Sequence, residues 1–89
     1  MSYLLVVHKV QDYDRWRPYF DADQERQQEA GLTVRHVLRN ADDPQEVVVL
    51  FEAVDLGRAR NLVGSEELRK VMEEAGVLGR PDVHFLQTP

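Results

Sequence analysis

The stretch YLLVVHKVQDYDRWRPYF, residues 3–20, contains the pattern that organises the whole chain. Its first part is a valine-rich apolar run typical of a β-strand, and the rest places aromatic residues at helical spacing. The same strand-then-helix layout returns later in the sequence. We expect strands at residues 3–10, 33–40, 47–54 and 83–87, and helical regions at 13–30 and 56–75. This β-α-β-β-α-β order predicts a ferredoxin-like α+β fold with a four-stranded antiparallel sheet.

Capping residues indicate where the first helical region begins and ends. Asp12 or Asp14 can cap its start, because a short acidic side chain accepts hydrogen bonds from free backbone N–H groups. Pro18 is comfortable only in a first helical turn, so either the helix begins near Arg17 or its first turn is kinked. Gly31 suits a left-handed conformation at the helix end.

Similar signals divide the second half of the chain. Asp55 can cap the second helical region, and Gly64 and Ser65 should split it into two pieces, the second with Leu68, Val71, Met72 and Ala75 as its apolar stripe. Residues 76–81 contain two glycines and a proline, which predicts an irregular connection into the last strand.

A hairpin is expected between the two middle strands, because residues 40–45 carry turn-forming side chains. Counting outward from that turn predicts three cross-strand pairs: Asn40 with Glu46, His36 with Leu50, and Val34 with Glu52. Cross-strand partners share a face of the sheet. His36, Leu50 and Glu52 should therefore point the same way.

Length and charge limit the class of protein. A chain of 89 residues predicts one domain, residues 1–89. The hydrophobic core of so small a domain is only marginally sufficient, so we expect a homodimer that buries further apolar surface. The net charge of −5 argues against nucleic acid or an anionic membrane as a partner. No apolar run is long enough to span a membrane, and the first residues lack the zones of a signal peptide, so we expect a cytoplasmic protein.

The strands carry the chemically interesting residues. If the first strand runs parallel to the third and shares its parity, His8, Glu52 and His84 lie near one end of the sheet, on the face that also carries His36. A one-residue slip or a bulge would separate them.

Two chemistries follow from such a cluster. Three imidazoles and a carboxylate could ligate a transition metal. Alternatively, His8 or His84 acts as a base oriented by Glu52 and deprotonates a phenol or an acidic C–H. The simpler interpretation is that the histidines are hydrogen-bonded structural residues and that Glu52 forms a salt bridge.

The first helical region independently suggests a pocket. Tyr13, Trp16 and Phe20 form a stripe that continues at helical spacing into Asp23 and Gln27. Together with Tyr19, these residues would suit a cleft for a flat, partly polar ligand. The alternative is that Trp16 and Phe20 belong to the ordinary core.

The opposite sheet face should be an apolar dimer surface, since large exposed apolar patches usually mark interfaces. By parity it would carry Tyr3, Leu5, Val7, Val37, Val47, Val49, Phe51, Val83 and Phe85. The histidine-bearing face would then line the pocket within each monomer.

Three segments resemble small proteins of the dimeric α+β barrel superfamily, in the branch of antibiotic biosynthesis monooxygenases: YLLVVHKVQDYDRWRPYFD, LRNADDPQEVVVLFE and LRKVMEEAGVLGRPDVHFL. The resemblance implies a ferredoxin-like monomer that pairs with a second copy and encloses a small pocket. The superfamily includes oxygenases that need no cofactor. The haem-degrading branch of the superfamily carries a Trp and a His in its second helical region. Residues 56–76 of this chain contain neither, so haem degradation is not expected. The Asn, Trp, Tyr and Arg pattern of the polyketide oxygenases does not map residue by residue.

These observations lead to one functional hypothesis and one alternative. The hypothesis is a cofactor-independent, monooxygenase-like or cyclase-like enzyme acting on an aromatic or polyketide-type substrate. Its catalytic residues would be His8, His84 and Glu52, and its substrate-binding residues Trp16, Tyr19, Phe20 and His36. The alternative is a non-catalytic ligand-binding or dimerisation module in which the histidines are structural.

Overall fold

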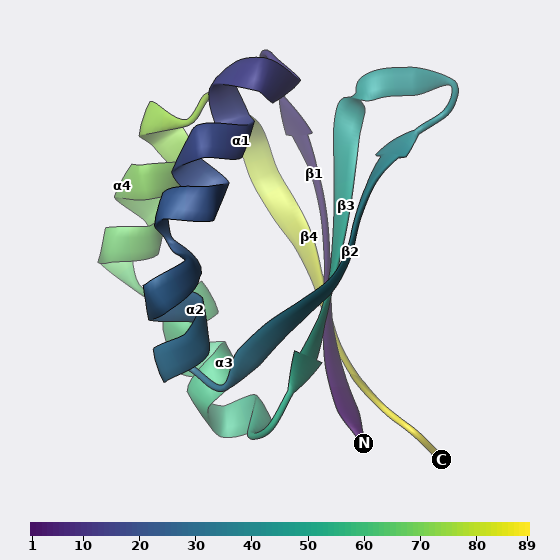
Figure 1. The fold of residues 1–89 in the computed structure, drawn as a ribbon, viewed down its shortest axis with the longest axis vertical. Helices are drawn as coiled ribbons and strands as arrows, with labels where there is room; N and C mark the ends of the chain where they lie inside the picture. The colour runs from purple at the N-terminus through teal and green to yellow at the C-terminus, as the bar shows by residue number, and fades with distance from the viewer.

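The computed structural model, which describes residues 1–89, is a four-stranded sheet covered by helices on one face (Figure 1). Its elements are β1 (Ser2–Val10), α1 (Tyr13–Ala22), α2 (Gln24–Glu29), β2 (Leu32–Asn40), β3 (Asp43–Ala53), α3 (Leu56–Val63), α4 (Glu66–Glu74) and β4 (Val77–Gln87). The strand order is β2-β3-β1-β4, and every neighbouring pair is antiparallel. This is the predicted ferredoxin-like α+β fold.

Side-chain caps start three of the helices where the sequence predicted them. Asp12 accepts a hydrogen bond from the Asp14 N–H at 3.0 Å, Asp55 from the Gly57 N–H at 2.8 Å, and Ser65 from the Leu68 N–H at 3.2 Å. Each cap satisfies a backbone donor that the helix itself leaves free. The predicted division of the second helical region at Gly64 and Ser65 is also confirmed.

The first helical region differs from the single helix that was expected. It breaks at Asp23, whose φ of −88° and ψ of 3° separate α1 from α2. The alternative start near Arg17 is wrong, because the Asp12 cap lets the helix begin at Tyr13 and continue through Pro18. After α2, Gly31 has a φ of +75°, the left-handed conformation predicted for it.

The last strand is longer than predicted and starts at Val77 instead of Val83. Residues 79–81, expected to be a connection, form an irregularity inside β4: Leu78 pairs with Lys9 and Asp82 with Val7. Gly79 has a φ of +69°, and proline lacks the N–H that a regular ladder needs, so both suit a bulge.

The hairpin register is partly as predicted. His36 pairs with Leu50, but Val34 pairs with Phe51 instead of Glu52. The cause is a bulge between Val34 and His36, which adds one residue to β2. The β2 residues before the bulge therefore point to the opposite face of the sheet from the one predicted. At the turn, Asn40 pairs with Asp43 instead of Glu46.

The two sheet faces therefore differ from the expected sets. One face packs against the helices and is buried; it carries Leu4, Val6, His8, Val34, Val37, Val47, Val49, Phe51, Val83 and Phe85. The open face carries Tyr3, Leu5, Val7, Leu38, Val48, Leu50, Glu52, His84 and Leu86. Six residues assigned to a dimer surface are therefore misplaced: Val37, Val47, Val49, Phe51, Val83 and Phe85. Val47, Val49 and Phe51 belong to the core beneath the helices, and the other three pack against it.

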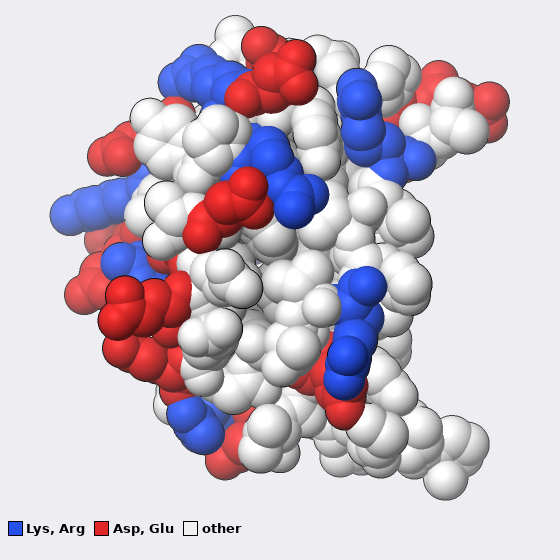
Figure 2. All heavy atoms as spheres, in the orientation of Figure 1, with Lys and Arg blue, Asp and Glu red and all other residues white.

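Charged side chains are unevenly distributed. Figure 2 shows acidic and basic groups crowded over the helical side of the molecule and sparser along the edge of the sheet. No helix is long and apolar enough to cross a membrane.

Candidate functional site

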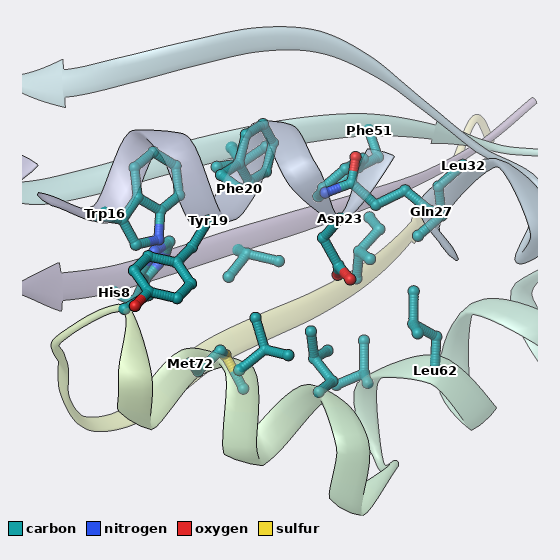
Figure 3. A pocket seen from close by; sticks show the side chains of 17 residues that line it. His8, Trp16, Tyr19, Phe20, Asp23, Gln27, Leu32, Phe51, Leu62 and Met72 are labelled. Carbon is teal, nitrogen blue, oxygen red and sulfur yellow. The ribbon is translucent and has the colours of Figure 1, made fainter. Parts of the chain in front are cut away.

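A cavity of about 90 Å³ lies between the helices and the face of the sheet that they cover (Figure 3). β1 and β3 form its back, α1 and α2 form one side, and α3 and α4 form the other. Apart from His8, Asp23 and Gln27, its lining is hydrophobic or aromatic. A largely apolar hollow with a few polar groups is the usual form of a small-molecule site, so this cavity is the candidate functional site.

His8 is the polar residue at one end of the cavity. It lies in β1 opposite Val47 of β3, with only 7% of its surface exposed. On its other side β4 bulges, so that no β4 residue pairs with it. Bulges recur beside functional sites because they redirect the local backbone. The glycine and proline of β4 thus shape the strand next to His8.

Burial determines the protonation of His8. Loss of water around the imidazole lowers the pKa of His8 from 6.5 to about 4, so the ring is neutral at pH 7. Its Nδ1 atom is buried and has no hydrogen-bond partner in the protein. An unpaired buried polar atom costs about 1–3 kcal/mol. A ligand that hydrogen-bonds His8 would therefore recover free energy that the protein alone does not.

Aromatic side chains of α1 enclose His8. The Trp16 ring lies with its centroid 5.3 Å from that of His8, and it stacks on Phe20 at 4.8 Å with an interplanar angle of 26°. Phe20 in turn contacts Phe51 of β3 at 6.2 Å. Tyr19 is 38% exposed and lines the cavity from its solvent side. Trp16, Tyr19 and Phe20 thus lie on the cavity wall, where the helical spacing placed them.

The other end of the cavity carries Asp23 and Gln27 (Figure 3). Burial raises the pKa of Asp23, although Arg26, whose Nε lies 3.4 Å from Asp23 Oδ1, opposes the shift. Gln27 is only 5% exposed, and its Oε1 is buried with no hydrogen-bond partner. The cavity therefore has a polar group at each end and an apolar middle.

A second hollow, of about 330 Å³, adjoins the cavity between α4 and β4. The two share four wall residues, Val6, Val63, Leu68 and Met72. Methionine is unbranched and changes shape easily. Met72 is therefore the shared wall residue whose shape can change most easily.

The predicted cluster of His8, Glu52, His84 and His36 does not form. His8 faces the cavity, whereas the other three lie on the open face of the sheet. Glu52 pairs across the sheet with Tyr3 and forms an ion pair with Arg35, whose Nε donates to Glu52 Oε2 at 2.6 Å. Glu52 is therefore too far round the sheet to orient His8, and it forms a salt bridge, as the simpler interpretation expected.

Strand direction explains the error. β1 and β3 are antiparallel, so His8, near the end of β1, meets Val47 near the beginning of β3. Glu52 lies at the opposite end of β3 and on the opposite face. His36 and His84 are exposed, and no group of three or more His, Asp or Glu side chains is placed to hold a metal ion.

One wall of the cavity has no distinct signal in the sequence. Leu68, Val71 and Met72 were identified as an apolar stripe, but nothing in their spacing distinguishes a cavity wall from an ordinary core. Leu62 and Val63 of α3 were not singled out at all. The glycine and proline of residues 79–81 were a usable signal for the bulge beside His8.

Comparison with known proteins supports the fold and leaves the chemistry open. No protein-family model matches the sequence, and no curated protein matches it. A candidate antibiotic biosynthesis monooxygenase from Bordetella bronchiseptica has a similar structure, with a TM-score of 0.78 and 14% identity over 99% of this chain and 96% of that one. Another, from Caulobacter crescentus CB15, gives a TM-score of 0.74 and 15% identity over 99% and 89% of the two chains.

The same fold also occurs in proteins with other names. An uncharacterised NIPSNAP domain protein from Burkholderia xenovorans matches with a TM-score of 0.59 and 10% identity, over 100% of this chain and 95% of that one. The chain therefore has the fold of the antibiotic biosynthesis monooxygenases. At these identities the likeness concerns the fold, and function must be argued from the site.

Proposed function

We propose that the protein binds a small aromatic molecule in the cavity and acts on it as a cofactor-independent, monooxygenase-like or cyclase-like enzyme. The observation that carries the proposal is His8, a buried neutral imidazole with an unpaired Nδ1 at the end of an aromatic-lined cavity. The likeness to structures named as monooxygenases supports the same chemistry. His8 takes the role of proton acceptor, and Trp16, Tyr19 and Phe20 hold the ring.

Proton transfer to His8 depends on the substrate. A base with a pKa of about 4 is too weak to ionise a phenol in isolation. Transfer creates an imidazolium next to a substrate anion, however, and the attraction between these charges is strong where water is excluded. This attraction offsets part of the cost of charging His8, and it acts only on a molecule that lies directly against the imidazole.

Oxygenation can follow from the substrate anion. For a hydroquinone, dioxygen would insert one oxygen atom into the ring and release the other as water, giving a hydroxyquinone. The substrate supplies all the electrons, so that hydroquinone plus O₂ balances hydroxyquinone plus H₂O. In a cyclase-like reaction His8 would instead take a proton from an acidic C–H of the substrate. The carbanion would attack a carbonyl of the same molecule, forming a C–C bond, and the resulting alkoxide would take the proton back from His8.

The size of the cavity limits the ligand. An engineered protein cavity of about 150 Å³ accommodates benzene, so the present volume of about 90 Å³ accepts a ring only after side chains move. The wall residues that can move most easily are Met72, which has an unbranched flexible side chain, and Tyr19, which is partly exposed. Opening toward the second hollow would bring the volume into the range of about 300–1,000 Å³ that is typical of ligand sites.

The test is turnover of hydroquinone and naphthohydroquinone under ¹⁸O₂, with oxygen uptake and product mass measured against buffer. His8→Phe keeps an aromatic ring against Trp16 but removes both nitrogens, and it should lower the rate by about 10²- to 10⁴-fold. His84→Phe, on the open face, should keep the wild-type rate. Full activity in His8→Phe would contradict the catalytic role and favour the structural alternative.

A second candidate, a dimerisation module, is favoured by the uncovered face of the sheet. Tyr3, Leu5, Val7, Val48 and Leu50 are only partly buried there, and Leu38 and Leu86 are exposed. Apolar surface of this kind on a small protein usually marks an interface. We infer a homodimer that joins these faces, which is compatible with an enzyme in each protomer.

A further inference from the structure

The junction between α1 and α2 departs from the usual behaviour of a helix start. Asp23 occupies the position before α2, where aspartate normally accepts a hydrogen bond from the helix backbone. Asp12 and Asp55 do so at their helices, but Asp23 makes no such bond. Its carboxylate points into the cavity instead (Figure 3). Local rules are most often broken where a side chain serves a site.

Gln27, one helical turn further along, is the second polar group at this end. It is more than nine-tenths buried, lines the same cavity, and leaves its Oε1 without a partner. Buried polar side chains are nearly always hydrogen-bonded, so an unpaired amide oxygen beside a cavity is informative. Together the two residues offer acceptor atoms to whatever the cavity binds.

The charge of the lining narrows the ligand further. Asp23 is the only acidic residue on the wall, and no Lys or Arg lines it. Arg26 pairs with Asp23 but is not part of the lining. An anionic ligand would therefore meet a carboxylate and no cation of the wall, which is unfavourable in a site of low dielectric constant. The occupant should be uncharged.

This end is separate from the catalytic end. Trp16 lies against His8, and Gln27 follows it by about three helical turns, or about 16 Å of helix. The two polar ends thus meet different parts of a ligand, or different ligands in turn. Recognition at Gln27 can be changed without touching the group proposed to transfer protons.

We infer that Asp23 and Gln27 form a recognition site for a hydrogen-bond donor, a hydroxyl or an N–H, on an uncharged and otherwise apolar ring. The inference rests on the proposed function to the extent that the cavity must bind a small molecule. Under it, Gln27 is a specificity-determining residue, and a carboxylate in place of the hydroxyl is rejected.

Phenol and toluene provide a matched pair of probes, because they have the same shape and differ in a hydroxyl against a methyl group. Binding is followed by the fluorescence of Trp16, the only tryptophan in the chain and part of the cavity wall, with calorimetry as a second readout. Gln27→Leu should lower the phenol-to-toluene affinity ratio about tenfold. Gln28→Leu, at an exposed neighbouring position, should leave the ratio unchanged.

Benzoate tests the exclusion of anions. It should bind the wild-type protein more weakly than phenol, and Asp23→Asn should narrow that difference, since it removes the like charge. Gln27→Met repeats the first comparison with a side chain of similar length, so that poor folding of one variant does not decide the result.

The outcomes separate the two claims. An unchanged phenol-to-toluene ratio in Gln27→Leu and Gln27→Met overturns donor recognition while the binding cavity stands. Benzoate binding as tight as phenol binding overturns the restriction to uncharged ligands. If neither phenol nor toluene binds the wild-type protein, with no calorimetric signal and no change in Trp16 fluorescence, the proposed function fails and the recognition site fails with it.

Discussion

The two faces of the sheet contain the same kinds of side chain in opposite surroundings. On the helix-covered face, His8 is buried, neutral and packed against Trp16. On the open face, His36 and His84 are exposed, and Glu52 is neutralised by Arg35. A histidine in a strand therefore says little about function until its face is known, and only the covered face isolates an imidazole from water.

The largest expected effect is a difference in stability between mutations on the covered face and mutations on the open face. Leu4, on the covered face, is 2% exposed, and Leu4→Ala should lower the free energy of unfolding by about 2–5 kcal/mol. Leu86, on the open face, is 41% exposed, and Leu86→Ala should cost less than about 1 kcal/mol. Urea unfolding measures both, at a protein concentration low enough to keep the chain monomeric, because the proposed homodimer would cover Leu86. Equal losses would contradict the assignment of the core to one face.

The second effect is the pH dependence of stability that follows from the burial of His8. The unfolded chain takes up a proton on His8 near pH 6.5, but the folded chain does so only near pH 4. Stability is therefore lost as the pH falls through this window, by roughly 3 kcal/mol in total. His8→Phe removes this loss, so its stability relative to the wild type should rise by that amount between pH 7 and pH 4.

Urea unfolding at several pH values gives this difference directly. Contributions from the carboxylates cancel, because both proteins contain the same ones. Stability curves that stay parallel between pH 7 and pH 4 would mean that His8 is not desolvated.

The third effect concerns the open face. Leu50 lies between Leu5 and His36 in the middle of the sheet, and Leu50→Lys would place a charge in the proposed homodimer interface. The dissociation constant should rise by at least about 100-fold, or about 2.7 kcal/mol. Sedimentation velocity measures it, with Glu67→Lys on the exposed surface of α4 as the control. A wild-type protein that is monomeric at high concentration would contradict the dimer.

Much of the fold could be predicted because it depends on interactions between residues close together in the sequence. Asp12, Asp55 and Ser65 mark helix starts by short-range hydrogen bonds, and alternating apolar residues mark strands. These signals act within a few residues. They can therefore be recognised in the sequence without knowledge of the tertiary structure.

The site was harder to predict because it depends on long-range pairing. A single bulge between Val34 and His36 reversed the parity of part of β2, and the antiparallel direction of β1 placed His8 and Glu52 at opposite ends. The bulge has no local cause that the sequence displays. The direction of β1 against β3 follows from the antiparallel sheet that the sequence did predict, so the parallel arrangement assumed for these two strands was wrong. The residues from Trp16 to Gln27 line the cavity, as their spacing within one helical region suggested, and Trp16 also belongs to the buried core.

The most direct test of a buried, neutral His8 in the cavity is an NMR titration of the histidine ring signals, with His8→Phe used to assign His8. The structure predicts that the His8 imidazole stays neutral until about pH 4, and that phenol shifts its signals at pH 7. A His8 ring that titrates near the ordinary value of 6.5 and ignores phenol would contradict both its burial and its place in a ligand site.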